Sequence, residues 1–270
     1  MSTLLLVHAH PDDESIFGGG AIIRAHREGK RVVLVTCTGG EVGEIHNMDE
    51  AENRPRLKEV RRQELERAAE ILGIDRIFWL GYRDSGMAGT GDNQNPASFN
   101  MAPLEETAAK LAPIIEEEKP DVVVTYGPDG VYGHPDHIKA HQTTVAAWEL
   151  LAAKGEAPAR LWYAVIPRSG MEEFRRRLEE AGQDVSSFDG GTIAGVPDDE
   201  IDAIVDVQDV AAQKKQAFQA HVSQNDPSSF FLNTPDELFK QAFGLEAYTL
   251  ARGARDGGQL SDLFEGLDLG

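Results

Sequence analysis

The feature of this 270-residue chain that most restricts its fold is a regular alternation of strand-like and helix-like segments. The strand-like segments are short apolar runs, at residues 3–8, 31–38, 76–80, 122–126 and 160–166. The helix-like segments between them lie at residues 15–28, 56–72, 104–118 and 137–153. Strands that alternate with helices of this length predict an α/β fold with a Rossmann-like, mostly parallel sheet and helices on both faces.

The pattern weakens after residue 158 but does not end. It predicts helices at residues 171–181, 210–222 and 235–243, and strands at residues 201–205 and 247–251. We therefore expect a Rossmann-like core over residues 1–158, followed over residues 159–270 by a continuation of the fold and a smaller C-terminal cap. A single domain over residues 1–252 is the alternative.

Composition excludes several classes of protein. No apolar run reaches the ~18 residues of a membrane span, and no basic segment precedes an apolar one as in a signal peptide. The single cysteine, Cys37, cannot form an intrachain disulfide, which fits a cytoplasmic location, and we expect it to be a buried thiol. The net charge of -20 opposes binding to nucleic acid or to an anionic membrane. A small-molecule substrate is the expected partner.

Two stretches repeat the tripeptide His-Pro-Asp, at residues 10–12 and 134–136, and each adds further side chains that can bind a metal. The first continues into Asp13, and the second into His137. Each follows a strand-like run and precedes a helical pattern, and proline is well tolerated in the first turn of a helix. Both motifs are therefore expected at junctions between a strand end and a helix N-terminus.

Other polar clusters also follow predicted strands, at residues 39–44, 82–86 and 129–137. In an open α/β sheet, ligands bind beyond the carboxyl ends of the strands, so these segments are expected to converge on one edge. The loop from Gly86 to Ala102 is long and glycine-rich, which is typical of functional lids or of disorder.

A catalytic zinc site needs three protein ligands and an open position. His10 and Asp13 are spaced so that both can reach one ion, and His137 can supply the third ligand. Asp12 and His134 then lie beside the open position, where Asp12 can act as a general base and His134 as a donor of a hydrogen bond or proton. An Asp-Asp pair at a helix start is more often an N-cap, and it is the second motif that favours the metal site.

The remaining histidines carry weaker signals. His8 lies on a strand and is interpreted as a hydrogen-bonded core residue, whereas His26 and His46 are expected to be solvated or in loops. His141, one turn after His137, either reaches the site or flanks it. The glycines at residues 18–20 and 39–40 do not form the G-x-G-x-x-G pattern of a dinucleotide site.

The segments at residues 10–14 and 132–137 resemble the two signature motifs of the zinc-dependent PIG-L (LmbE-like) N-deacetylases. Residues 36–44, 82–90 and 220–224 are similar to the branch that handles thiol glycosides. That branch includes the N-acetylglucosaminyl-inositol deacetylase of mycothiol synthesis, the mycothiol S-conjugate amidase and, more distantly, deacetylases of the bacillithiol pathway. The resemblance extends from Leu4 to about Arg252.

The resemblance implies a role for each matching position. Residues 1–158 would form the metal-binding deacetylase core, with one Zn²⁺ per chain, or another divalent metal such as Fe²⁺. The implied roles are metal ligation by His10, Asp13 and His137, general base catalysis by Asp12, transition-state stabilisation or protonation by His134, closure over the carbonyl by Tyr132, and contacts with the sugar or its aglycone by Arg61, Glu44 and Asp84. Alternatively, Arg61 and Arg62 pair with Glu59, Glu64 and Glu66 on a solvated helix face. Phe17 departs from the polar or basic residue expected beside the aglycone.

The sequence therefore predicts a hydrolase that removes acetate from an N-acetylglucosaminyl glycoside. An amidase that cleaves thiol S-conjugates with the same residues is the nearest alternative. A non-haem iron oxygenase would share the set of two histidines and one carboxylate. However, oxygenases with a His-x-Asp spacing are built on all-β jelly rolls, whereas this chain alternates helix and strand. A non-catalytic sugar-binding module would not need Asp12 beside an open coordination position. The sequence allows a homo-oligomer and gives no reason to expect nucleic acid or a membrane as a partner.

Overall fold

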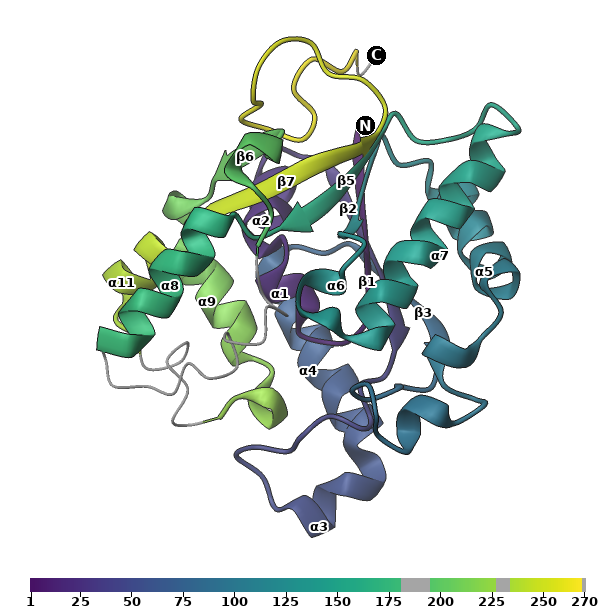
Figure 1. Cartoon of the computed structure of the whole chain (residues 1–270), viewed down its shortest axis with the longest axis vertical. Coiled ribbons are helices and arrows are strands. Elements are labelled where there is room, and N and C mark those ends of the chain that lie inside the picture. Colours follow the sequence, from purple (N-terminus) through teal and green to yellow (C-terminus); the bar gives the residue numbers. More distant parts are fainter. Residues whose placement is uncertain (181–194, 227–233, 269–270) are drawn as a thin grey trace.

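The computed structural model describes residues 1–180, 195–226 and 234–268. Its centre is a seven-stranded sheet in the order β3-β2-β1-β4-β5-β7-β6 (Figure 1). The strands are β1 Thr3–His8, β2 Arg31–Thr38, β3 Arg76–Tyr82, β4 Val122–Tyr126, β5 Arg160–Val165, β6 Ala203–Asp206 and β7 Leu245–Arg252. The five strands from β3 to β5 pair in parallel, and β7 is antiparallel to both of its neighbours. The predicted mostly parallel α/β sheet is confirmed.

The helices of the described residues are α1 Asp13–Ile16, α2 Gly19–Arg27, α3 Glu50–Asn53, α4 Leu57–Leu72, α5 Leu104–Glu118, α6 Gly130–Gly133, α7 Pro135–Ala152, α8 Arg168–Glu180, α9 Ala211–Gln219 and α11 Asp236–Phe243. Most lie within three residues of the predicted bounds. Ala181, the predicted end of the helix that corresponds to α8, lies outside the described residues. The helix predicted at residues 15–28 is wrong in one respect, because it is broken into α1 and α2.

The break between α1 and α2 occurs at Phe17 and Gly18. Gly18 has a φ of 128°, which residues with a Cβ rarely adopt, and a Cβ there would lie 3.2 Å from the Leu6 side chain. The chain therefore turns after one helical turn instead of continuing. This turn brings Phe17 back against the end of β4, where its ring lies edge-on to Tyr126 with the centroids 5.7 Å apart.

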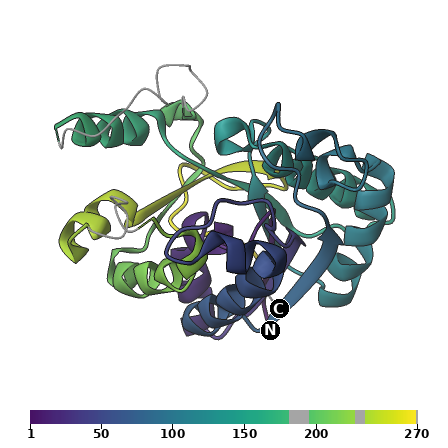
Figure 2. The same cartoon turned by 90° about the horizontal axis from the view of Figure 1, so that it is seen from below.

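Two apolar layers cover the two faces of the sheet. Strands β1, β2 and β4 are buried along almost their whole length, as expected for parallel strands covered on both faces, and successive side chains of β1 enter opposite layers. Helices α2, α4 and α9 cover one face, with Ile22 and Leu65 in that core, and α5 and α7 cover the other, with Leu111 and Leu151 (Figure 2). Cys37 is fully buried in the second layer, as predicted.

Residues on both sides of position 158 contribute to this single sheet, because β5, β6 and β7 continue it beyond β4. The chain after residue 252 also packs on the core, where Leu260, Leu263 and Phe264 are buried and Leu260 bridges to Ala203. The division of the chain at residue 158 stays a prediction. No helix among the described residues has the length and apolar character needed to cross a membrane.

Candidate metal centre and active site

Four metal-capable side chains from the two His-Pro-Asp motifs meet at the carboxyl edge of the sheet. His10 and Asp13 directly follow β1, whereas His134 and His137 lie at the start of α7, after β4. One ring nitrogen from each of the three histidines lies within 4.8 Å of the others. All four side chains are buried. The predicted convergence of the two motifs is confirmed.

Asp13 lies between two of these histidines. Its Oδ1 is 3.4 Å from His137 Nε2, and its Oδ2 is 3.4 Å from His10 Nδ1. Oδ2 also accepts hydrogen bonds from the Tyr126 hydroxyl at 2.7 Å and from the His10 amide at 2.8 Å. Burial alone would raise the pKa of Asp13, but the neighbouring His137 and His10 hold that pKa well below its ordinary value. The carboxylate is therefore ionised and aimed at the histidine cluster.

Further carboxylates surround His10. Its Nε2 lies 3.2 Å from Asp136 Oδ2 and 3.7 Å from Asp84 Oδ1, and these three residues form a second group able to hold a metal ion. Burial opposes protonation of His10, but Asp13, Asp136 and Asp84 together raise its pKa well above 6.5. A field that favours a proton so strongly also favours a divalent cation among the same groups.

His134 is oriented by the helix that it caps. Its Nδ1 accepts a hydrogen bond from the Asp136 amide at 3.1 Å, as an N-cap side chain does. Burial and the nearby His10 and His137 lower the pKa of His134 to about 3, so the ring is neutral. Since Nδ1 acts as an acceptor, the network assigns the proton to Nε2. His134 thus presents an N–H donor to the site rather than a free lone pair.

Unlike His134, His137 makes no hydrogen bond through its ring among the described residues. Its side chain is fully buried. Burial lowers its pKa to about 4 despite the opposing charge of Asp13. Its ring stacks on Tyr126 with the centroids 4.2 Å apart and the planes 10° from parallel. Buried ring nitrogens without a hydrogen bond are costly, and a metal ion beside Asp13 and His10 would satisfy Nε2, which lies 3.4 Å from Asp13 Oδ1. The donor set of two histidines and one carboxylate suits zinc.

Asp12 differs from its neighbour Asp13 in both backbone and surroundings. It occupies the N-cap position of α1 without making a side-chain cap bond, so the N-cap interpretation is not supported. Its φ of 113° is unusual for a residue other than glycine. Burial raises its pKa to about 6, although Arg61 opposes the shift with Nη2 3.2 Å from Asp12 Oδ2. Asp12 is thus a partly exposed carboxylate at the rim of the cluster, with a raised affinity for protons.

The three side chains expected to contact the substrate lie in different surroundings. Arg61 is buried on α4, where it donates to the carbonyl of Gly40 at 2.8 Å, to the carbonyl of Pro11 and to Asp12. The alternative pairing on a solvated helix face applies to Arg62, which contacts Glu66, but not to Arg61. Glu44 is largely exposed in the loop after β2.

Asp84 is buried beneath that loop, and both of its oxygens already accept backbone hydrogen bonds. Oδ1 accepts from the Gly86 amide at 2.8 Å, and Oδ2 accepts from the Val42 amide at 3.2 Å. Burial alone would raise the pKa of Asp84, but His10, the Gly86 amide and the charge of Arg61 hold that pKa below its ordinary value. This geometry suits a residue that holds His10 and the Val42 loop in place, and a direct contact between Asp84 and a sugar stays a prediction.

Aromatic rings form the wall above the cluster. Tyr132 lies edge-on to His137 and His134, with centroid distances of 4.9 Å and 6.0 Å. It follows Val131, whose φ of 69° is a strained value for a β-branched residue. Phe17 lies edge-on to His137 at 6.0 Å, so an apolar ring borders the site where a polar or basic side chain was expected.

The remaining histidines have separate outcomes. His8 is buried as predicted, but neither of its nitrogens has a hydrogen-bond partner in the part of the chain that the structure describes; instead, its ring lies 5.3 Å from that of Tyr126. The prediction of a hydrogen-bonded His8 is therefore wrong. His141 Nδ1 contacts the carbonyl of Tyr126 at 2.9 Å and so flanks the site. His26 is exposed, and His46 lies in a loop 3.4 Å from Glu44.

Sequence reasoning missed two residues of the cluster, Tyr126 and Asp136. Tyr126 ends β4, where it holds both Asp13 and the amide of Ala9, which donates to its hydroxyl at 2.8 Å. Asp136 receives hydrogen bonds from the amide and hydroxyl of Ser85 while it contacts His10. The repeated tripeptide marked Asp136, and the strand end marked Tyr126, but nothing in the sequence showed their partners.

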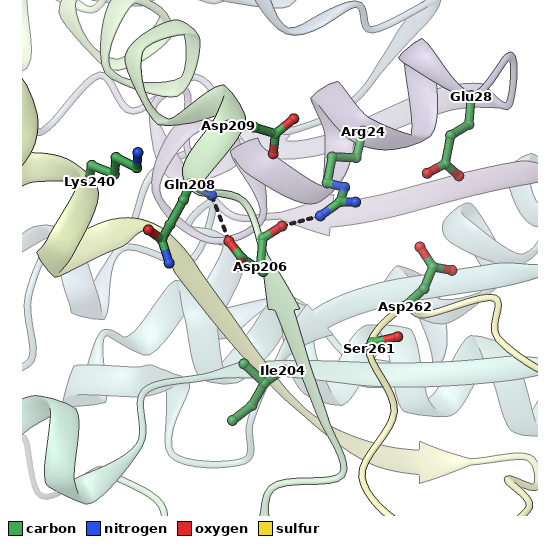
Figure 3. Close-up of a pocket in the computed structure, with 9 residues that line it drawn as sticks. All are labelled: Arg24, Glu28, Ile204, Asp206, Gln208, Asp209, Lys240, Ser261 and Asp262. Carbon is green, nitrogen blue, oxygen red and sulfur yellow. Dashed lines mark hydrogen bonds between the residues drawn. The ribbon is translucent and has the colours of Figure 1, made fainter.

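A separate cavity of about 690 Å³ lies elsewhere on the molecule (Figure 3). Its lining residues are Arg24, Glu28, Ile204, Asp206, Gln208, Asp209, Lys240, Ser261 and Asp262. Arg24 donates to the carbonyl of Asp206, and the other charged groups are of mixed sign. None of these residues belongs to the histidine cluster, so this cavity is distinct from the candidate metal centre.

The chain is similar over most of its length to proteins of one known family. Residues 5–148 match the family described as PIG-L, GlcNAc-PI de-N-acetylase. The 1D-myo-inositol 2-acetamido-2-deoxy-alpha-D-glucopyranoside deacetylase of Salinispora arenicola is 39% identical, over 98% of this chain and 91% of its own length. The enzyme of the same name from Thermomonospora curvata is 41% identical, over 98% of this chain and 96% of its own length.

Solved structures show the same fold at lower identity. The N,N'-diacetylchitobiose deacetylase of Pyrococcus horikoshii has a TM-score of 0.63 at 21% identity, covering 92% of this chain and 83% of that one. The 4-carboxy-2-hydroxymuconate hydratase of Pseudomonas putida has a TM-score of 0.61 at 19% identity, covering 96% and 99%. One fold thus supports two reactions, and the reaction has to be argued from the site. The two sequence motifs, the match over residues 5–148 and the relatives at about 40% identity show that this chain belongs to the PIG-L family of GlcNAc-PI de-N-acetylases.

Proposed function

We propose that this protein is a zinc-dependent deacetylase that removes acetate from an N-acetylglucosaminyl glycoside. The observation that carries the proposal is the position of Asp12 beside the cluster of His10, Asp13 and His137. The substrate follows from the relatives, which are named for 1D-myo-inositol 2-acetamido-2-deoxy-alpha-D-glucopyranoside and are alignable over 98% of this chain. A glycoside of this kind is also the substrate expected from residues 36–44, 82–90 and 220–224, which are similar to the branch of the family that handles thiol glycosides.

His10, Asp13 and His137 are the residues that would hold the zinc ion. The alternative set replaces Asp13 with His134, but His134 Nδ1 already accepts the Asp136 amide. The nitrogen that remains, Nε2, then carries a proton and has no lone pair to offer. When bound, zinc lowers the pKa of a water molecule and polarises a carbonyl oxygen.

Asp12 and His134 have complementary roles in the reaction, Asp12 as a proton acceptor and His134 as a hydrogen-bond donor. Asp12 accepts a proton from the water that attacks the acetamide carbon. His134 donates a hydrogen bond through Nε2–H to the oxygen of the tetrahedral intermediate, where negative charge develops. The C–N bond then breaks as the departing nitrogen takes up the proton that Asp12 accepted, which restores the Asp12 carboxylate and releases acetic acid, ionised to acetate near neutral pH, and the free amine. Arg61 holds the Asp12 carboxylate at the rim through its contact of 3.2 Å.

The substrate side of the proposal concerns the aromatic wall and the loop after β2. Tyr132, which lies edge-on to His134 and His137, would close over the reacting carbonyl. Glu44 would meet the sugar or its aglycone from its exposed position in the loop. Arg61 and Asp84 would support the sugar subsite, since both hold that loop from beneath through Gly40 and Val42.

A panel of acetamides tests the reaction and separates it from the nearest alternative. Zinc-loaded protein is incubated with the inositol glycoside, with other N-acetylglucosaminyl glycosides and with a thiol S-conjugate, and free amine is measured. We expect amine and acetate from the inositol glycoside. Amine release from the S-conjugate alone would show that the protein is an amidase and not a deacetylase. Substrate binding without any amine release would indicate a non-catalytic sugar-binding module.

A further inference from the structure

A buried pair of titratable residues, Glu14 and His221, lies directly behind Asp12 and has no part in the proposed reaction. His221 Nε2 is 2.7 Å from Glu14 Oε1, and both side chains have an exposed fraction of 0%. The two residues lie far apart in the sequence, with Glu14 on α1 and His221 after the end of α9. A fully buried ion pair is weak evidence for a purely stabilising role, because apolar residues of similar volume often do as well.

The Glu14 carboxylate reaches back along its own chain to Asp12. Its Oε2 accepts a hydrogen bond from the Asp12 amide at 2.9 Å, while Oε1 also accepts from the Ser15 hydroxyl at 2.7 Å. Asp12 has a φ of 113° and a ψ of -30°, a conformation that a residue with a Cβ keeps only when its surroundings hold it there. If that hold were lost, the peptide would rotate and the Asp12 carboxylate would turn with it.

His221 in turn determines where the Glu14 carboxylate lies. The segment around His221 is itself fixed to α4, because the amide and hydroxyl of Ser223 donate to the buried Glu64 carboxylate at 2.7 Å and 2.6 Å. The same segment receives the His46 amide at the Ser223 carbonyl, at 2.7 Å, from the loop after β2. Through His221, the Glu14 carboxylate is therefore held in place by α4 and by the loop after β2, and not only by the short helix α1.

We propose that His221 and Glu14 are positioning residues that hold Asp12 in the conformation needed for proton transfer. His221 orients Glu14, and Glu14 holds the Asp12 amide, while Arg61 holds the Asp12 carboxylate from the other side. Both side chains are fully buried, so neither His221 nor Glu14 is open to contact with a substrate. The proposal rests on the proposed function in one respect, because it assigns proton transfer to Asp12.

The kinetic test compares two substitutions of His221. His221→Leu removes the donor to Glu14, whereas His221→Gln places an amide N–H near the position of Nε2. We expect His221→Leu to lower kcat by roughly 10- to 100-fold, the usual range for residues that support an active-site group, with little change in KM or zinc content. His221→Gln is expected to recover most of the loss. A raised KM with unchanged kcat, or loss of zinc, would overturn the proposal.

A double-variant comparison tests whether His221 acts through Asp12. In the Asp12→Asn background, His221→Leu should cause no further loss of kcat, because effects that act through one group are not additive. Fully additive losses would contradict the proposal. The matched control is Lys214→Met, which breaks another buried ion pair that involves α9, with 2.7 Å between Lys214 Nζ and Glu246 Oε1. It should lower the melting temperature but leave kcat unchanged, and an equal loss of kcat would assign the His221 effect to general destabilisation.

A measurement without substrate separates this proposal from the proposed function. Hydrogen exchange of the Asp12 amide should be slow in the wild type and faster in His221→Leu, with the amides of β1 unchanged. Fast exchange at Asp12 in the wild type, or no change in the variant, would overturn the positioning role whatever the enzyme's activity. If His221→Leu does not fold, His221→Asn, a polar side chain too short to reach Glu14, takes its place in every comparison.

Discussion

At the scale of residues, the site depends on two adjacent aspartates whose surroundings drive their pKa values apart. Burial raises the pKa of Asp12 to about 6, whereas His137 and His10 overcome burial at Asp13 and hold its pKa well below the ordinary value. Two carboxyl groups whose pKa values differ in this way usually have different roles in acid–base chemistry. Asp13, between two histidines, suits a permanent anion that binds a cation, and Asp12 suits a group that accepts a proton.

Substitution of Asp12 should separate catalysis from metal binding. Asp12→Asn keeps the shape of the side chain but removes its ability to accept a proton. We expect kcat to fall by about 10²- to 10⁴-fold, the usual contribution of a general base, while zinc content and substrate affinity stay near those of the wild type. Steady-state kinetics and elemental analysis measure both quantities. Zinc lost from Asp12→Asn but retained in Asp13→Asn would mean that the two carboxylates have exchanged roles.

Substitutions of the two histidines on α7 should have opposite effects on the metal. His137→Ala removes a proposed zinc ligand and should reduce zinc well below one ion per chain, with a loss of thermal stability because the energy of metal binding also stabilises the fold. His134→Ala should retain zinc and lose activity, since its Nδ1 is engaged with the Asp136 amide. Elemental analysis of the two variants, purified side by side, decides between the ligand sets. Zinc lost from His134→Ala and kept in His137→Ala would favour the three-histidine arrangement.

At the scale of elements, helix α4 and the loop after β2 fit together around Arg61. Its guanidinium group lies against Gly40, where a Cβ would come within 2.3 Å of Nη1, and Gly40 has a φ of 65°. The loop can therefore approach α4 only because this position has no side chain. Arg61 in turn reaches Asp12, so the packing of a loop on a helix is transmitted to the proposed base.

Gly40→Ala should disturb this contact, and Gly29→Ala is its matched control. Both glycines have a positive φ, of 65° and 76°, so each alanine costs about 1 kcal/mol in backbone strain, but a Cβ at Gly29 meets nothing within 4 Å. We expect Gly40→Ala to lower kcat/KM by roughly tenfold or more, the size of effect expected when an active-site group is misplaced. Gly29→Ala should lose stability but keep wild-type kinetics. Equal kinetics in the two variants would show that the Arg61 contact has no effect on catalysis.

The sequence predicts this edge of the molecule only in part. The ligand motifs could be placed because each follows a strand, and the carboxyl ends of parallel strands lie on one edge of a sheet. The buried contacts of Arg61 with Gly40, Pro11 and Asp12 could not be predicted, because nothing in the sequence distinguishes a buried arginine on a polar helix from an exposed one. Tyr126 and Asp136 were missed for a related reason, since their roles depend on contacts with Asp13, Ser85 and His10 that are distant in sequence.

At the scale of the whole molecule, a buried ionic network joins the C-terminal strand to the N-terminal half. Glu246 on β7 accepts hydrogen bonds from the amides of Gly20 and Ala21, at 2.8 Å and 2.9 Å, at the start of α2. Its Oε1 also lies 2.7 Å from Lys214 Nζ on α9. The sequence predicted both the strand and the two helices, but not the insertion of β7 between β5 and β6, because strand order depends on pairing between distant segments.

Glu246→Gln should therefore be destabilising in a pH-dependent way. The substitution leaves the Lys214 charge buried without its partner, which costs roughly 3–5 kcal/mol near neutral pH. Burial opposes ionisation of Glu246, but Lys214 and the two amides lower its pKa below the ordinary 4.5. The stabilisation by this carboxylate is present above about pH 4.5 and is lost as the pH falls through the lowered value. Denaturant unfolding at pH 7 and pH 4 should show a smaller difference between variant and wild type at pH 4.

A second substitution controls for the buried charge. Lys214→Met removes the cation, so the double variant Glu246→Gln/Lys214→Met should be more stable than Glu246→Gln alone. A difference between Glu246→Gln and the wild type that does not change between pH 7 and pH 4 would show that the carboxylate is not selectively stabilised in the folded protein.

If deacetylation requires one metal ion held by His10, Asp13 and His137, the activity of metal-free protein should depend on added zinc, and a zinc titration measures this dependence. Acetate release from 1D-myo-inositol 2-acetamido-2-deoxy-alpha-D-glucopyranoside is measured as zinc is added to chelator-treated wild type and to His137→Ala. We predict that the wild-type rate rises in proportion to zinc and levels off at about one ion per chain, as expected for a single catalytic site, while His137→Ala stays inactive. Acetate release by metal-free wild type would show that the ion is not required, and equal activation of His137→Ala would show that His137 does not hold it.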